Sequence, residues 1–156
     1  MIRSIIIDDE VHCLDTLDML IHDYCPEVEV MDKCISGKKA LEAIGRIKPD
    51  LIFLDIEMPS MNGFELLEQF TSIPFSIVFT TSYDQYAIKA IRFSALDYLL
   101  KPIDPKELVA AMKPGKELRP RPRFFLKFPL ELAVERQQLR HLGNAFRFPP
   151  PKPYAE

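Results

Sequence analysis

Short apolar runs alternate with segments of helical spacing along the first 112 residues. Five runs are rich in β-branched and other apolar residues and predict strands, at 3–7, 28–34, 51–55, 76–80 and 95–100. The run Leu51-Ile52-Phe53-Leu54 is apolar without alternation, which is typical of a strand covered on both faces. The pattern therefore predicts a sheet buried between two layers.

A helix is predicted after each of these strands, from apolar residues that share one helical face. The inward candidates, in chain order, are Leu14, Leu17, Leu20, Ile21 and Tyr24; then Ala40, Leu41, Ile44 and Ile47; then Phe64, Leu66 and Leu67 within 63–70; then Ala87, Ile88 and Ile91 within 83–93. The last helix begins at Asp104-Pro105, an N-cap followed by a proline in the first helical position. Five such units in succession indicate an α/β fold, with a parallel sheet, right-handed crossovers and helices on both faces.

Residues 113–156 do not continue this pattern. They hold eight of the 14 prolines, so the segment 113–129 is too proline-rich for a helix, and 148–156 reads as an extended or disordered end. Between them, 130–142 could form one amphipathic helix. The sequence therefore divides into a domain of residues 1–112 and a proline-rich tail of residues 113–156.

Charge follows the same division. Residues 1–112 carry a net charge of −9 and residues 113–156 a net charge of +6, which together give the −3 of the whole chain. An acidic domain binds nucleic acids poorly, whereas a basic tail could contact DNA.

Composition places the chain among ordinary soluble proteins, at 47% hydrophobic and 28% charged residues. No apolar run approaches the ~20 residues of a membrane span, and the opening MIRSIIIDDE does not resemble a signal peptide. The three cysteines form no CxxC pair, so their spacing implies neither a disulfide framework nor a zinc site. We expect a cytoplasmic protein with reduced thiols and no membrane contact.

Polar side chains follow four of the predicted strands. Because the carboxyl ends of parallel strands share one edge, that edge collects Asp8, Asp9, Asp55, Thr81 and Lys101. Three neighbouring carboxylates repel one another and need a cation or a proton, and oxygen ligands suit Mg²⁺ better than zinc. A carboxylate beside a metal can act as a nucleophile and form an aspartyl phosphate. The ammonium and hydroxyl groups are suited to offset the charge of a phosphoryl group.

Each of these residues also has a purely structural interpretation. Asp55 could simply open the following turn, and the acidic pair Asp8-Asp9 could complement a helix macrodipole. A threonine at a strand end is usually structural, and a single lysine is usually solvated. The combination of all these groups at one edge favours a joint site over the separate explanations.

Four segments resemble the receiver domain of bacterial two-component response regulators, in one register across residues 1–112: IIIDDE, LIFLDIEMPSMNGFELL, FTTSYDQYAIKAI and ALDYLLKPID. The stretch 80–104 is most similar to LytTR-type regulators, whose receiver usually precedes a DNA-binding domain. The resemblance implies a flavodoxin-like, doubly wound sheet of five strands in the order 2-1-3-4-5.

The resemblance also implies roles for the acidic residues. Asp55 corresponds to the phosphoacceptor. Asp8 and Asp9 match the pair that holds Mg²⁺, with Asp9 as the direct ligand and Asp8 acting directly or through water. Glu57 would offer its backbone carbonyl to the metal.

Further roles follow from the same resemblance for residues of the fourth and fifth strands. Thr81 and Thr80 both could match the switch hydroxyl of the family. Thr81 is preferred, because the family places the switch residue last on the strand. Lys101 matches the phosphate-binding lysine, and the Lys101-Pro102 bond is expected to be cis. Tyr98 matches the aromatic residue that changes rotamer on activation, and its alternative is a tyrosine packed at a sheet edge.

The function implied is a phosphorylation-dependent switch and not an enzyme with an external substrate. A sensor histidine kinase would supply a phosphohistidine, and the face formed by residues 83–112 would be remodelled and could mediate homodimerisation. The chain itself would catalyse only its own phosphotransfer and autodephosphorylation. The output would be control of transcription, with DNA binding only if an output domain is present.

Three alternatives remain from the sequence. A small phosphatase of the haloacid dehalogenase type would carry a DxD nucleophile on the first strand, whereas that strand ends here on adjacent Asp8-Asp9. A phosphate-independent protein-interaction module would have the same shape without the chemistry. The tail could be the linker of a truncated regulator, a divergent short effector, or sequence altered at a junction.

Overall fold

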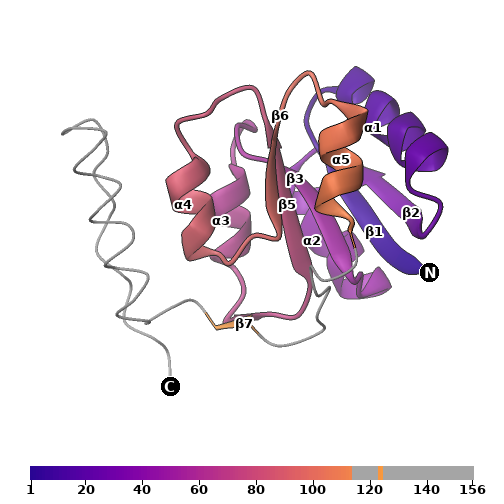
Figure 1. The fold of residues 1–156 in the computed structure, drawn as a ribbon. Coiled ribbons are helices and arrows are strands. Elements are labelled where there is room, and N and C mark those ends of the chain that lie inside the picture. The colour runs from indigo at the N-terminus through magenta and orange to yellow at the C-terminus, as the bar shows by residue number, and fades with distance from the viewer. Residues whose placement is uncertain (114–122, 125–156) are drawn as a thin grey trace.

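The computed structural model describes residues 1–113 and 123–124, and its centre is a five-stranded parallel sheet (Figure 1). The spatial order is β2-β1-β3-β5-β6. These strands are β1 Ile2–Ile7, β2 Val28–Cys34, β3 Leu51–Asp55, β5 Ser76–Thr81 and β6 Asp97–Leu100. Counted along the chain within this sheet, the order is 2-1-3-4-5, so the predicted flavodoxin-like topology is confirmed.

Within residues 1–113, five helices cover the two faces of the sheet. They are α1 Val11–Tyr24, α2 Gly37–Ile47, α3 Gly63–Leu67, α4 Ala87–Arg92 and α5 Pro105–Ala111. Helices α1 and α5 lie on one face, and α2, α3 and α4 lie on the other (Figure 1). The sheet is therefore buried between two helical layers, as the apolar runs predict.

Strand β3 shows how the two halves of the core are built. Ile52 and Leu54 belong to the cluster packed under α2, α3 and α4, whereas Leu51 and Phe53 belong to the cluster under α1 and α5. All five residues of β3 are buried. Alternate side chains of one strand thus fill opposite cores, which explains why its sequence shows no polar alternation.

Local signals in the sequence fix several helix ends. The Ser36 side chain accepts a hydrogen bond from the Lys39 N–H at the start of α2, and Asp104 accepts one from the Lys106 N–H at the start of α5. Pro105 occupies the first turn of α5, as predicted. In α1 the predicted face is largely buried, but Tyr24 is 51% exposed, because its polar-tipped ring lies at the margin of the apolar stripe in the last turn.

The fourth helix differs from the prediction. It spans six residues instead of the expected 83–93, and Ile91, an inward candidate, is 38% exposed. Ile88, another inward candidate, is buried as predicted, at 7% exposure. The residues of this segment that join the core cluster under α2, α3 and α4 are Tyr86, Ala90 and Phe93, which are spaced i, i+4 and i+7 and form a different face. Ile91 lies about 100° from that face and was therefore wrongly assigned.

A two-stranded antiparallel pair, β4 Ser72–Ile73 with β7 Arg123–Phe124, was not predicted. The predicted helix at 130–142 and the extended end at 148–156 lie outside the described residues, as does most of the tail. Over residues 1–113 and 123–124, no helix is both long enough and apolar enough to cross a membrane.

Candidate functional site

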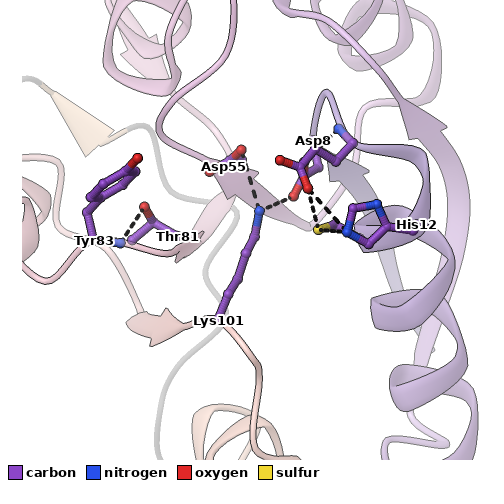
Figure 2. A network of polar contacts seen from close by, with 8 residues as sticks. Asp8, His12, Asp55, Thr81, Tyr83 and Lys101 are labelled. Carbon is purple, nitrogen blue, oxygen red and sulfur yellow. Dashed lines mark hydrogen bonds and ion pairs between the residues drawn. The ribbon is translucent and has the colours of Figure 1, made fainter.

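The carboxyl ends of the central strands bring the predicted polar residues to one edge of the sheet. Asp8 directly follows β1, Asp55 is the last residue of β3, Thr81 is the last residue of β5, and Lys101 directly follows β6. In Figure 2 Asp55 lies between Asp8 on one side and Thr81 on the other, with the Lys101 side chain reaching toward it. Strand order and strand polarity therefore assemble the site.

The ammonium group of Lys101 joins two buried carboxylates. Its Nζ atom donates to Oδ2 of Asp8 at 2.6 Å and lies 3.5 Å from Oδ2 of Asp55 (Figure 2). Asp8 is 2% exposed and Asp55 is 5% exposed. The Lys101 side chain is 17% exposed, so one partly buried positive charge faces two buried negative charges, and the pocket remains negative overall.

A third carboxylate completes the pocket. Asp8, Asp9 and Asp55 each present an oxygen, and these oxygens all lie within 4.8 Å of one another. Asp9 is partly exposed, so the cluster is open to solvent on one side. A set of oxygen donors with room for water fits a Mg²⁺ ion, which prefers carboxylates and retains several water ligands.

The pKa values reflect this crowding of charge. Burial and the neighbouring charge of Asp8 raise the pKa of Asp55 from 3.8 to about 7, although Lys101 acts in the opposite direction. Burial by itself lowers the pKa of Lys101, but the hydrogen bond to Asp8 and the charge of Asp55 outweigh it, so the pKa of Lys101 is raised. Near neutral pH the pocket therefore takes up a proton or a cation readily.

Gly63 holds the loop after Asp55 close to the strand. The Gly63 N–H donates to the carbonyl of Ile56 at 2.8 Å, and a Cβ atom at Gly63 would lie only 2.5 Å from the Asp55 carbonyl oxygen. Helix α3 begins there with a capping box between Asn62 and Glu65. The absence of a side chain at Gly63 thus lets a helix start directly against the end of β3.

Thr81 and Tyr98 are linked through the backbone of Tyr83. The buried Thr81 accepts a hydrogen bond on Oγ1 from the Tyr83 N–H at 3.2 Å, and the Tyr98 hydroxyl donates to the Tyr83 carbonyl. The partly buried Tyr98 ring packs against Phe79, and burial raises its pKa. Thr80, the competing candidate, is also buried and lies opposite Asp55 in the β3–β5 register.

Two further contacts connect the strand ends and the loops that follow them. The Lys101 N–H donates to the Thr81 carbonyl at 2.7 Å, and the Lys101–Pro102 peptide bond is cis. Glu57, considered for its carbonyl, also accepts a hydrogen bond on its side chain from the Tyr86 hydroxyl at 2.5 Å. This contact joins the loop after Asp55 to the start of α4, and no periodic or motif signal in the sequence indicated it.

Comparison with known proteins identifies the domain. The family model of the response regulator receiver domain matches residues 5–113. The chain is 39% identical over 119 residues to the sensory transduction protein LytT of Bacillus anthracis, which covers 75% of the chain and 48% of that protein. It is 39% identical over 110 residues to the transcriptional regulatory protein BtsR of Salmonella typhimurium, covering 69% of the chain and 45% of that protein. The chain thus spans about half the length of these relatives.

Solved structures give the same result. The response regulatory domain of mrkE from Klebsiella pneumoniae superposes with a TM-score of 0.65 at 29% identity, covering 70% of this chain and 91% of that one. The REC domain of AraT from Geobacillus stearothermophilus gives a TM-score of 0.62 at 26% identity, covering 91% of this chain and 98% of that one.

Proposed function

The chain belongs to the response regulator receiver domain family, and from this premise we propose that Asp55 accepts a phosphoryl group in a Mg²⁺-dependent reaction. A partner sensor histidine kinase supplies the group, and its arrival switches the face formed by α4, β6 and α5. The observation that carries the proposal is the Lys101 ammonium held between the buried carboxylates of Asp8 and Asp55.

Phosphotransfer requires a nucleophile and a way to offset charge. An Oδ atom of Asp55 attacks phosphorus, the bond between phosphorus and the imidazole nitrogen of the donor breaks, and the imidazole leaves with the electron pair. Lys101 supplies a positive charge beside the incoming phosphoryl oxygens. Asp8, Asp9 and Asp55, with the backbone carbonyl of Glu57, would hold Mg²⁺, which when bound supplies further positive charge for the phosphoryl oxygens.

The switch passes through Tyr83. In the unphosphorylated chain Thr81 uses its acceptor capacity for the Tyr83 N–H, so its own O–H can be donated to a phosphoryl oxygen. A turn of Thr81 toward the new charge breaks the bond to Tyr83, whose carbonyl also holds the Tyr98 hydroxyl. Thr81 and Tyr98 therefore change together, and α4 follows because Tyr83 lies just before it.

Partners and output follow from this switch. The surface of residues 83–112 contacts a second copy when it is remodelled. The relatives named as LytT and BtsR are sensory transduction and transcriptional regulatory proteins, so control of transcription is the output in this proposal. Residues 1–112 act as the receiver domain, and the basic tail of residues 113–156 acts as a linker or as the remnant of an output domain.

Intact mass after incubation with acetyl phosphate and Mg²⁺ tests the proposal. We expect one added phosphoryl group per chain. The adduct should not form when EDTA is present during the incubation, and it should not form in Asp55→Asn. If Asp55→Asn also gained a phosphoryl group, Asp55 would not be the nucleophile. No adduct together with no binding of beryllofluoride would instead make the chain a phosphate-independent interaction module.

A further inference from the structure

A second group of metal-ligating side chains lies at the start of α1, outside the three-carboxylate pocket. It consists of Glu10, His12 and Cys13. We infer that these three side chains bind one thiophilic divalent cation with the coordination chemistry of Zn²⁺. This inference does not depend on the proposed phosphotransfer.

The distances within this group match one face of a coordination tetrahedron. Sγ of Cys13 lies 3.5 Å from Nε2 of His12 and 3.4 Å from Oε2 of Glu10, and these nitrogen and oxygen atoms are 3.2 Å apart (Figure 2). Zinc bonds of about 2.0 Å to nitrogen and oxygen and about 2.3 Å to sulfur place tetrahedral ligands about 3.3–3.6 Å apart. All three distances between ligand atoms agree with that geometry to within a few tenths of an ångström.

The donor set selects the class of ion. Sulfur, imidazole nitrogen and carboxylate oxygen together suit Zn²⁺ and related ions, whereas Mg²⁺ prefers oxygen ligands throughout. Cys13 would bind as the thiolate and release its proton to water, so thiolate and carboxylate together balance the ion's two charges. The three-carboxylate pocket and the site of Glu10, His12 and Cys13 would therefore bind different metals.

The site is reachable and has an open position. The side chains of His12 and Glu10 are 79% and 56% exposed, so an ion can enter from solvent. Three protein ligands leave the fourth position of a tetrahedron for water or a small ligand. The Cys13 N–H donates to the Glu10 carbonyl at 3.0 Å, which keeps these two ligands one helical turn apart on the same side.

The backbone connects this site to the carboxylate pocket. The Glu10 N–H donates to Oδ1 of Asp8 at 2.9 Å, while Asp8 also holds Lys101. An ion bound by the Glu10 side chain is therefore connected to the pocket through the hydrogen bond between Glu10 and Asp8. Occupancy of one site is expected to change the affinity of the other for its own cation, and by the same factor in both directions.

Cobalt(II) provides a spectroscopic test on the full chain. Cys25 and Cys34 are buried, at 1% and 4% exposure, so a thiolate ligand in the folded protein can come only from Cys13. Titration in the presence of excess Mg²⁺, which occupies oxygen-only sites, should produce a thiolate-to-cobalt charge-transfer band at one equivalent. Added Zn²⁺ should abolish the band by displacing the cobalt.

Matched variants locate the ligands. Cys13→Ser should lose the band, and His12→Gln should weaken Co²⁺ binding roughly tenfold or more. His22→Gln, an exposed histidine on the same helix, and Asp55→Asn should both retain it. No band with Co²⁺ in large excess, or a band unchanged in His12→Gln, would overturn the inference. If Cys13→Ser did not fold, the comparison of His12→Gln with His22→Gln would decide.

Discussion

The middle and the carboxyl end of strand β3 are equally buried but contribute to stability with opposite sign. Phe53 is 0% exposed and packs in an apolar core, whereas Asp55, two residues later, is 5% exposed and faces another carboxylate. Burying a phenylalanine side chain stabilises a protein by about 1.5–3 kcal/mol. Burying an ionised carboxylate costs free energy unless a cation compensates it.

This difference explains how the domain can respond to a ligand. The apolar middle of the sheet is stable enough to hold three carboxylates and one ammonium in a poorly balanced arrangement at its edge. Any added positive charge relieves the repulsion there, while the core does not change. Substitutions that alter only the core or only the edge should therefore separate the two contributions to stability.

Truncation in the core should have the largest effect on stability. We expect Phe53→Ala to lower the free energy of unfolding by roughly 3–5 kcal/mol, because it removes a large side chain from a fully buried position. Urea denaturation followed by circular dichroism measures the change. Phe53→Leu, which retains most of the volume, should cost clearly less. Equal losses in the two variants would show that the core is not tightly packed around this ring.

Filling the space at Gly63 should have the next largest effect. The new Cβ atom of Gly63→Ala would meet the Asp55 carbonyl oxygen at 2.5 Å, so the strand end or α3 must shift, at a cost of roughly 1–3 kcal/mol. Gly45→Ala is the matched control, because no atom lies within 4 Å of the added Cβ. Thermal unfolding should show this control stabilised by about 0.5–1 kcal/mol. Two neutral substitutions would refute the close approach.

Removal of the edge charge should stabilise the fold. Because the pKa of Asp55 in the folded state, about 7, lies above its ordinary 3.8, the folded chain binds this proton more tightly than the unfolded chain. The free-energy cost of ionising Asp55 in the folded chain is therefore absent below about pH 4, grows as the pH rises and is complete above about pH 7. We expect Asp55→Asn to be more stable than the wild type by about 1–3 kcal/mol near pH 8 and equal to it near pH 4.

Denaturation at a series of pH values, with and without Mg²⁺, measures this difference. Mg²⁺ should raise the stability of the wild type and have little effect on Asp55→Asn, because the third carboxylate of the cluster is missing. A wild type that gains stability relative to Asp55→Asn as the pH rises from about 4 to about 7 would show that the carboxylate of Asp55 is not destabilised in the folded chain.

Loss of the Tyr98 hydroxyl should have the smallest effect. Tyr98→Phe removes one hydrogen bond to the Tyr83 carbonyl and leaves the ring packed on Phe79, so we expect a loss of about 1 kcal/mol. Tyr24→Phe, at a 51% exposed position, is the control and should be neutral in the same thermal unfolding experiment. Equal effects in both variants would remove the link between Tyr98 and the loop before α4.

Much of this arrangement could be predicted from the sequence because it depends on short-range patterns. The apolar runs and helical spacings gave five units, and the rule that parallel strands end at one edge brought Asp8, Asp55 and Lys101 together. In these positions the local preference and the tertiary fold agree. Capping residues such as Asp104 fixed their helix starts for the same reason.

The remaining features depend on contacts between distant segments. Residues 83–86 were expected to be helical, but Thr81 and Tyr98 hold Tyr83, and Tyr86 binds Glu57. The pairing of β4 with β7 joins two-residue segments about fifty positions apart, which is too short for any periodicity. The close approach at Gly63 and the arrangement of Glu10, His12 and Cys13 are likewise visible only in three dimensions.

If the proposed function is correct, Asp55, and not Asp8 or Asp9, accepts the phosphoryl group at this edge of the sheet. Reduction with borohydride after incubation with acetyl phosphate and Mg²⁺ converts an aspartyl phosphate to homoserine, and peptide mass mapping then locates the modified residue. We expect modification at Asp55 alone, with Asp8 and Asp9 unchanged. Modification at Asp8 or Asp9, or an unmodified chain, would contradict it.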